Sequence, residues 1–316
     1  MIRKGRRSKI LGLMIRTALV VGLLGLAIHM NRAEIQGVWA RKPDPWGFAR
    51  GLGLYLSGMF FAWARWYMLV RAAGLAFRYR DAVRLGFIAA LFNFVIPGAV
   101  FGNVVKAAFL CRERPDDKPR AIASVLTDFL CGLIGLFLIA ALVGTIGRAQ
   151  LDPRVRNLVI AAWIAVGVAM LVLFSTFRPR KSKESKIGAG VYRDHLGLVA
   201  VGIVMGMGTH ALNIMAFHSI SVAMFGASSV PGLAEHFLIV PMVLFTTAVP
   251  LPFGALGVSE QASQGLFGLM KYKGGAVAML GFRVVMLVGA VIGAGVYMFN
   301  AKEVRELAKT EDAELL

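Results

Sequence analysis

The feature that most constrains this chain is a series of eight long apolar runs, separated by short segments that hold most of the basic residues. Six runs are unbroken and contain about 20 residues or more, the length that a helix needs to cross a hydrocarbon core of about 30 Å. They cover residues 10–30, 48–70, 121–146, 158–177, 196–225 and 275–300. These runs predict an all-α, polytopic membrane protein with six full spans. No segment between them is long and polar enough for a separate soluble domain.

The other two runs, residues 82–111 and 236–270, are interrupted by Pro97 and by Pro250 and Pro252. Proline ends the ladder of helical hydrogen bonds, and lipid offers no partner for the freed backbone groups. Such a break is tolerated where it is buried in protein or lines a cavity. We therefore expect both runs to be re-entrant helical hairpins. The alternative is a full span with a kink.

The positions of the basic residues along the chain favour the hairpins. They also argue against a nucleic-acid-binding protein. The formal net charge is +18, but the basic residues gather between the apolar runs, where Lys and Arg mark the cytoplasmic side of a membrane. Basic clusters lie at residues 3–9, 71–84, 112–120 and 178–193, whereas residues 227–234 carry no charge. All four clusters fall on one side only if the first broken run is a hairpin, and the C-terminal tail lies on that side as well if the second broken run is a hairpin. Both termini are then cytoplasmic.

This arrangement predicts a single transmembrane domain, residues 1–316, built as an inverted repeat. Each half, residues 1–150 and 151–316, reads span, span, hairpin, span, and the halves have opposite orientation. Transporters with such repeats bind their substrate where the repeats meet. The hairpins also match locally, as PGAVFGNVVKA from Pro97 and PFGALGVSEQA from Pro252. Gly102 then corresponds to Gly257, and Lys106 to Gln261.

Five ionisable residues inside the apolar runs stand out: Arg65, Lys106, Asp128, Glu260 and Arg283. A charge at such a position costs about 2.5–3.5 kcal/mol on insertion scales, so it is usually paired or functional. One interpretation is that Lys106 pairs with Asp128, and Glu260 with Arg283, to hold the fold together. The other is that these residues line a site for an anionic or zwitterionic headgroup, and both can hold. Arg65 could instead extend to the membrane surface.

Polar residues complete the candidate site. In the run 196–225, His210, Asn213 and Ser221 share a stripe that is either a water-accessible face or a set of helix contacts. Gly202 and Gly206 in the same run suit close helix packing. The candidate substrate-binding residues are Asn93, Pro97, Gly102, Asn103, Lys106, Asp128, His210, Asn213, Pro252, Gly257, Ser259, Glu260 and Arg283.

Familiar catalytic motifs do not occur in the sequence. It contains no G-x4-G-K-[ST] loop, no H-E-x-x-H motif and no G-x-S-x-G motif. Cys111 and Cys131 are the only cysteines and form no Cys/His cluster for a metal. We therefore expect no cofactor and no metal. A transporter of this kind would act passively or on an ion gradient.

Three segments resemble the flippase-like transmembrane family of the lysylphosphatidylglycerol synthases. They are the first hairpin with its glycine and lysine, SVLTDFLCGLIGL from Ser124, and VPLPFGALGVSEQA from Val249. Arg283 in the last span is also typical of that family. The resemblance implies lipid translocation or handling. Members fused to an aminoacyl-transferase domain move aminoacylated phosphatidylglycerol to the outer leaflet, and stand-alone members are linked to hopanoids and polyprenyl-linked sugars.

The chain departs from the family pattern at three positions. Asn103 stands where an acidic residue is common, and Phe129 and Ser259 stand where arginine is common. Fewer charges line the expected site, which favours a substrate less polar than an aminoacylated lipid.

We therefore predict a lipid transporter or flippase of the bacterial cytoplasmic membrane, and not an enzyme. It would move a phospholipid, hopanoid or polyprenyl-linked lipid between leaflets. One alternative is a membrane-embedded enzyme that uses Asp128 or Glu260 as acid or base. Another is an assembly factor for a separate lipid synthase. A second copy of the chain is a further candidate partner, whereas nucleic acid is not expected.

Overall fold

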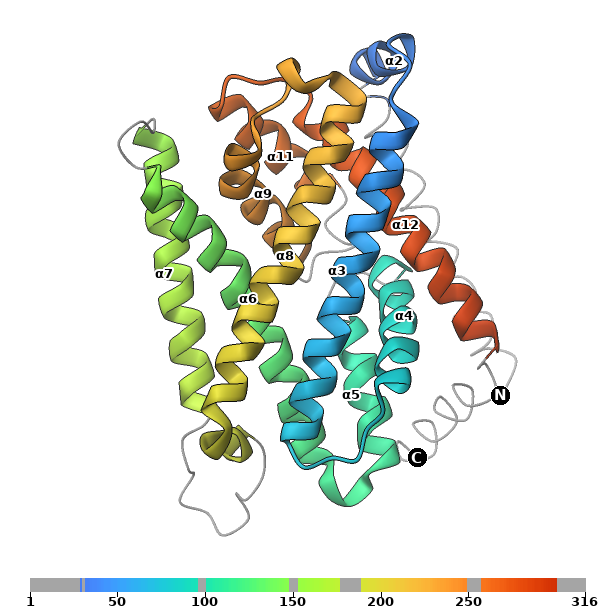
Figure 1. The fold of residues 1–316 in the computed structure, drawn as a ribbon, viewed down its shortest axis with the longest axis vertical. Coiled ribbons are helices and arrows are strands. Elements are labelled where there is room, and N and C mark those ends of the chain that lie inside the picture. Colours follow the sequence, from blue (N-terminus) through green and yellow to red (C-terminus); the bar gives the residue numbers. More distant parts are fainter. Residues whose placement is uncertain are drawn as a thin grey trace, which may run out of the picture.

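The computed structural model describes residue 29 and residues 32–95, 101–147, 153–176, 189–248 and 257–299. These residues form α-helices joined by short turns and three 3-10 helices, without a β-strand in the described ranges (Figure 1). The α-helices are α2 (Arg32–Ala40), α3 (Pro45–Ala72), α4 (Tyr79–Val95), α5 (Phe101–Glu113), α6 (Lys118–Ile146), α7 (Pro153–Thr176), α8 (Leu196–Phe225), α9 (Leu233–Ala248), α11 (Val258–Leu269) and α12 (Gly275–Phe299).

Four of the described helical segments are long and apolar enough to cross a membrane: Pro115–Ile146, Pro153–Ser175, Val191–Phe225 and Gly275–Phe299. They contain α6, α7, α8 and α12, at the positions where the sequence predicts spans. The predicted span at residues 48–70 forms α3, a helix of 28 residues. The predicted first span, residues 10–30, lies outside the described residues apart from residue 29. The chain is therefore a multi-pass, all-helical membrane protein.

Both runs that contain prolines form two helices, as the sequence predicts. The first gives α4 and α5, of 17 and 13 residues, and the second gives α9 and α11, of 16 and 12 residues. At 1.5 Å per residue each is about 18–26 Å long, shorter than a typical span. In each pair the two helices pack against each other. The pairs lie toward opposite ends of the molecule, α9 and α11 near the top of Figure 1. Pro97, Pro250 and Pro252 lie outside the described residues.

The centre of the molecule is the long contact between α3 and α8. Helix α3 begins where the Asp44 carboxylate accepts hydrogen bonds from the backbone N–H groups of Trp46 and Gly47, both at 3.0 Å. Pro45 fills the first helical position, where its missing N–H costs nothing. Around the α3–α8 contact, α4 packs on α12 and α9 packs on α6. The two short-helix pairs therefore close the two sides of one central region.

Helices α6 and α8 approach each other closely because glycine faces glycine. A Cβ atom at Gly135 would lie 2.6 Å from the Gly206 carbonyl carbon, and one at Gly206 would lie 2.5 Å from the Cys131 carbonyl oxygen. A Cβ at Gly202 would lie 3.3 Å from the Cys131 Sγ atom. The predicted role of Gly202 and Gly206 in helix packing is therefore confirmed.

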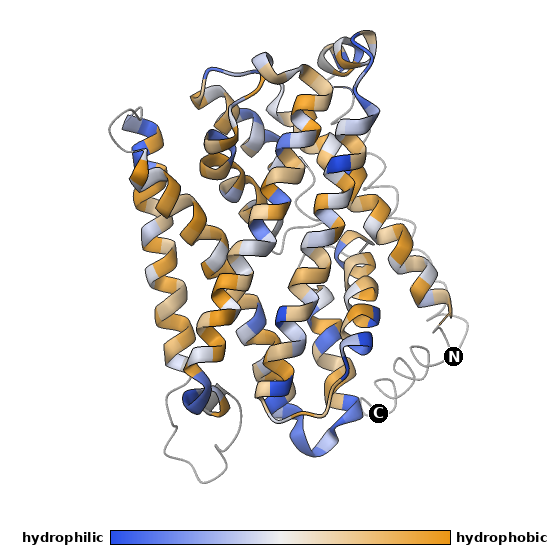
Figure 2. Ribbon diagram, viewed as in Figure 1, coloured by the Kyte–Doolittle hydropathy of each residue, from blue (hydrophilic) through white to orange (hydrophobic). Residues whose placement is uncertain are grey.

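The outermost helices present apolar side chains outward. Figure 2 shows α7 and α12 as mostly apolar along their length, with hydrophilic residues near the turns at the two ends of the molecule. On α7, Ile164 and Leu171 are 61% and 71% exposed. Large aliphatic side chains in such numbers suit contact with lipid rather than water. Polar groups are instead collected inside, between α3, α6, α8 and the short helices.

The close α6–α8 contact predicts that Gly206→Ala destabilises the protein. The added methyl group would collide with backbone, so we expect a loss of about 1–3 kcal/mol, typical of overpacking. The matched control is Gly167→Ala on α7, where a Cβ would meet nothing within 4 Å. That change should be neutral or stabilising by up to about 1 kcal/mol. Thermal unfolding in detergent, followed by tryptophan fluorescence, measures both. Equal midpoints for the two variants would contradict the packing argument.

Candidate functional site

A cavity of about 390 Å³ lies in the central region and is lined by seven helices. Helices α3, α6, α8 and α12 supply four of its walls, and the short helices α4, α5 and α9 supply the rest. Both short-helix pairs therefore contribute to one cavity. Its volume falls within the range of about 300–1,000 Å³ that is usual for small-molecule sites.

The first charged cluster of the cavity centres on Asp128 of α6, which is 3% exposed. Its Oδ1 atom accepts a hydrogen bond from Nε of Arg65 on α3 at 2.7 Å. Its Oδ2 atom lies 3.7 Å from Nζ of Lys106 on α5. The Lys106 ammonium also lies 4.6 Å from the centre of the Trp66 ring, a cation–π contact. One carboxylate thus joins two cations from two other helices.

Glycine makes room for the Arg65 side chain. Asp128 and Gly132 are four residues apart, so they lie on the same face of α6. A Cβ atom at Gly132 would come 3.1 Å from Nη2 of Arg65, and one at Gly206 would come 3.2 Å from Nη1. The guanidinium group therefore occupies space that any larger residue on α6 or α8 would take.

The second charged cluster joins α11 to α12. Arg283 donates from Nε to Oε1 of Glu260, and both side chains are buried. The other carboxylate oxygen, Oε2, accepts from the backbone N–H of Gly257 at 2.6 Å. Gly257 precedes α11 with a φ of +87°, a conformation that suits glycine. Glu260 therefore fixes the start of α11 and orients Arg283, which lines the cavity.

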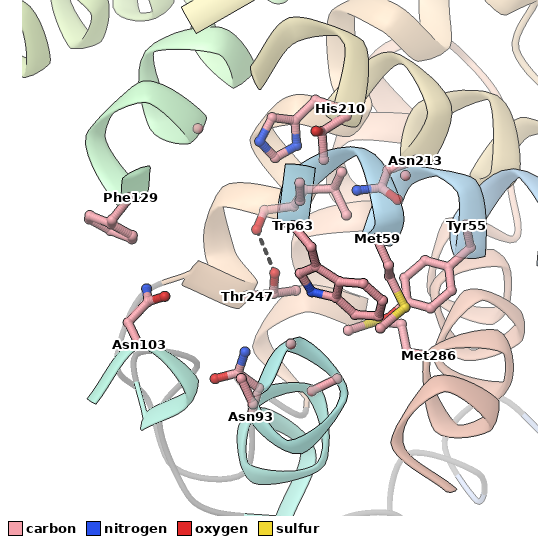
Figure 3. A pocket seen from close by; sticks show the side chains of 18 of the residues that line it. Tyr55, Met59, Trp63, Asn93, Asn103, Phe129, His210, Asn213, Thr247 and Met286 are labelled. Carbon is pink, nitrogen blue, oxygen red and sulfur yellow. Dashed lines mark hydrogen bonds between the residues drawn. The ribbon is translucent and has the colours of Figure 1, made fainter. Parts of the chain in front are cut away.

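Polar groups line the remaining wall. Figure 3 shows Asn93 of α4 and Asn103 of α5 on one side of the cavity, with His210 and Asn213 of α8 on the other. Asn93 Oδ1 accepts from the backbone N–H of Gly102 at 2.7 Å and ties α4 to α5. Nδ1 of His210 and Oδ1 of Asn213 are buried, and no described residue forms a hydrogen bond with either atom.

Seven of the candidate residues named from the sequence line the cavity: Asn93, Asn103, Lys106, Asp128, His210, Asn213 and Arg283. Four others stand behind its wall. Gly102 and Gly257 donate the backbone hydrogen bonds described above, Glu260 holds Arg283, and the Ser259 hydroxyl bonds to that of Thr246 on α9 at 2.8 Å. Pro97 and Pro252 lie outside the described residues.

The structure bears on three alternatives that the sequence left open. Arg65 does not extend to the membrane surface, because it is 6% exposed and paired with Asp128. Both expected ion pairs are present, although Arg65 is closer to Asp128 than Lys106 is. Ser221 is buried and donates to the Phe217 carbonyl oxygen at 2.9 Å. The expected polar stripe therefore reaches the cavity only at His210 and Asn213.

Sequence reasoning missed most of the apolar wall. Tyr55, Met59 and Trp63 of α3, Phe129 of α6 and Met286 of α12 line the cavity (Figure 3). An aromatic or methionine residue in an apolar membrane helix carries no local signal that separates a cavity wall from a lipid-facing surface. The neighbouring helices decide whether such a residue faces a cavity or lipid, and only the fold shows which helices these are.

The comparison with protein families agrees with this architecture. The family described as the lysylphosphatidylglycerol synthase TM region matches residues 13–293, most of the chain. The chain belongs to this family. No curated protein matches it. The lysylphosphatidylglycerol synthase TM region is a membrane domain linked to lipid metabolism or transport, and it is not itself a catalytic domain.

In this member of the lysylphosphatidylglycerol synthase TM family, the cavity offers charge and hydrogen bonds rather than metal ligands. No group of three or more His, Cys, Asp or Glu within the described ranges is placed to hold a metal ion. Arginine and lysine donors suit a phosphate or carboxylate, and the aromatic wall suits an apolar portion of a ligand.

Because Asp128 compensates two cations, Asp128→Asn should strongly destabilise the protein. Removing the carboxylate leaves Arg65 and Lys106 buried and uncompensated, a situation that costs about 3–5 kcal/mol. The matched control is Asp117→Asn, since Asp117 pairs with Arg120 at 3.3 Å but is 40% exposed. That exposed pair should contribute about 0–1 kcal/mol. Thermal midpoints and the yield of monodisperse protein in detergent report the difference. Similar losses in both variants would show that Asp128 does not hold the cluster.

Proposed function

We propose that the protein is a lipid flippase, which moves a lipid with an anionic or zwitterionic headgroup between the leaflets of the bacterial cytoplasmic membrane. Candidate substrates are phospholipids, hopanoids and polyprenyl-linked lipids. The observation that carries the proposal is the central cavity, in which buried Arg65, Lys106, Asp128 and Arg283 lie among apolar helices. A headgroup crossing the membrane needs compensation for the water that it leaves, and fixed charges and polar side chains at this depth provide it.

An inverted repeat explains how both leaflets would reach one cavity. In the proposed repeat α3, α4, α5 and α6 correspond to α8, α9, α11 and α12. The packing supports this correspondence, because α12 packs on α4 as α6 packs on α9, and α5 packs on α6 as α11 packs on α12. The α4–α5 hairpin would enter from the cytoplasm and the α9–α11 hairpin from outside. Small movements of the halves about the α3–α8 contact would then open the cavity to each side in turn.

The apolar lining of the cavity suits the glycerol and acyl portion of a lipid. Trp63 and Met59 face the same space as the polar residues in Figure 3. A headgroup near Arg65 and Lys106 would leave the adjoining glycerol or first acyl carbons against these side chains. Buried apolar contact of this kind contributes about 25 cal/mol per Å².

The flippase proposal predicts that Lys106→Ala and Glu260→Ala slow lipid movement. The assay uses phosphatidylcholine liposomes that contain purified protein and a trace of fluorescent phosphatidylglycerol. Dithionite destroys only outer-leaflet fluorophores, so loss beyond the protein-free level measures flipping. Lys106→Ala removes a cation from the cavity, and Glu260→Ala removes the carboxylate that orients Arg283, so each should slow the reaction about tenfold or more. The control is Arg50→Ala on α3, whose side chain is 68% exposed.

The other outcomes of this assay would contradict the assigned site or favour a different function. Normal flipping by both variants would refute the assigned site. A new lipid product, detected by mass spectrometry, would favour a membrane enzyme that uses Asp128 or Glu260. Liposomes that are inactive until a co-purifying synthase is added would favour an assembly factor.

The proposed topology predicts which positions face each side of the membrane. We would place single cysteines at four exposed positions, through Arg78→Cys, Asp116→Cys, Ser229→Cys and Lys273→Cys, in a Cys111→Ser, Cys131→Ala background. A membrane-impermeant maleimide added to intact cells should label positions 229 and 273. Positions 78 and 116 should react only after permeabilisation. If either pair is split between the two sides, the helices between them form a full crossing and not a hairpin.

A further inference from the structure

The charges around the cavity are not balanced. In the cluster around Asp128, two cations face one carboxylate, and in the cluster around Glu260 one cation faces one carboxylate. The lining residues that are acidic or carry a Lys or Arg charge, Arg65, Lys106, Asp128 and Arg283, together with Glu260 behind them, therefore leave one positive charge in excess. The sequence between the short helices, residues 96–100 and 249–256, contains no ionisable residue that would offset it.

Arg65 has a hydrogen-bond donor that no described residue satisfies. It uses Nε for Asp128, and its buried Nη1 atom has no hydrogen-bond partner among the residues that the structure describes. A guanidinium group stays protonated even when buried, so this donor is permanent. Nearby on α8, His210 Nδ1 and Asn213 Oδ1 are also buried and lack a hydrogen-bond partner within the described part of the chain. Buried polar atoms are rarely left unpaired, and these three belong to side chains that line one cavity.

Each carboxylate, by contrast, already has a cationic partner. Asp128 is shared by Arg65 and Lys106. Glu260 accepts from Arg283 with one oxygen and from the Gly257 N–H with the other. No other carboxylate lines the cavity among the described residues. A substrate ammonium group would therefore find no acidic partner there, and it would meet the excess positive charge.

We infer that the cavity selects a headgroup of net negative charge, whose phosphate accepts a hydrogen bond from Arg65 Nη1 and lies against Lys106. This inference rests on the proposed flippase function and narrows it. The substrate is an anionic, phosphate-bearing lipid rather than a zwitterionic or aminoacylated one. A glycerophospholipid and a polyprenyl phosphate share this chemistry.

The test compares flipping rates of fluorescent lipids that differ only in headgroup. Phosphatidylglycerol is anionic, phosphatidylethanolamine is zwitterionic and lysylphosphatidylglycerol is cationic. All three lipids carry a phosphate, but only the last two carry an ammonium group, which would meet the excess positive charge. Wild-type protein in phosphatidylcholine liposomes should therefore move phosphatidylglycerol about ten- to a hundredfold faster than either of them.

A charge placed in the cavity wall should remove this preference without loss of the fold. Asn103 lines the cavity, and Asn103→Asp changes its charge with almost no change in size. The added carboxylate should lower the preference for phosphatidylglycerol at least about tenfold and favour the zwitterionic lipid. Lys106→Gln should also lower it, while the Arg65–Asp128 pair stays intact. The matched control is Asn157→Asp on the exposed surface of α7, which should keep the wild-type preference.

Failure of this inference and failure of the proposed function give different results. If no lipid moves at all, the flippase proposal itself fails. If lipids move at equal rates, or if Asn103→Asp leaves the preference unchanged, the flippase stands and the selection of anionic headgroups is refuted. Unlabelled competitors show which phosphate-bearing lipid is the substrate. Polyprenyl phosphate and phosphatidylglycerol are added separately, and the lipid that inhibits flipping more strongly identifies the class. Inhibition by neither refutes the inference.

Discussion

The centre of this protein depends on the carboxylate of Asp128. Three helices meet there, because Arg65 of α3 and Lys106 of α5 both contact an acidic residue of α6. Each of the three charges would be strongly unfavourable alone in an apolar region. Together they place α5, and with it the α4–α5 pair, against the long helices. The interaction that holds the fold is thus also the one that brings positive charge to the cavity.

The cluster around Glu260 has the same form but a different balance. Glu260 anchors the first turn of α11 and holds Arg283 of α12, much as Asp128 joins α6 to its neighbours. Its single cation is matched by a single carboxylate. The extra cation in the Asp128 cluster gives the cavity a net positive charge. A repeat of the backbone alone would not predict this difference between the two clusters. It arises from individual side chains.

Close helix packing makes the buried charges feasible. Gly132 and Gly206 leave space for the Arg65 guanidinium, and Gly135 lets α6 approach α8. With a larger residue at these positions the arginine would be displaced from Asp128 or the helices would separate. The large number of glycines, 36 in the chain, therefore bears on the site as well as on helix packing.

The sequence by itself determined the class of this protein and the positions of its helices. Hydropathy and proline act locally, so the long runs, the two breaks and the five buried charges could be found from neighbouring residues. The Glu260–Arg283 pair was also predictable, because these two residues of opposite sign are the members of the five that belong to the second half. Only the tertiary structure decided that Arg65, 63 residues away, is the closest partner of Asp128. It also decided that Ser259 and Gly102 stand behind the cavity while Trp63 and Tyr55 line it. The physical reason is that contacts between helices distant in sequence depend on crossing geometry and on the space that glycines leave, and no local pattern records either.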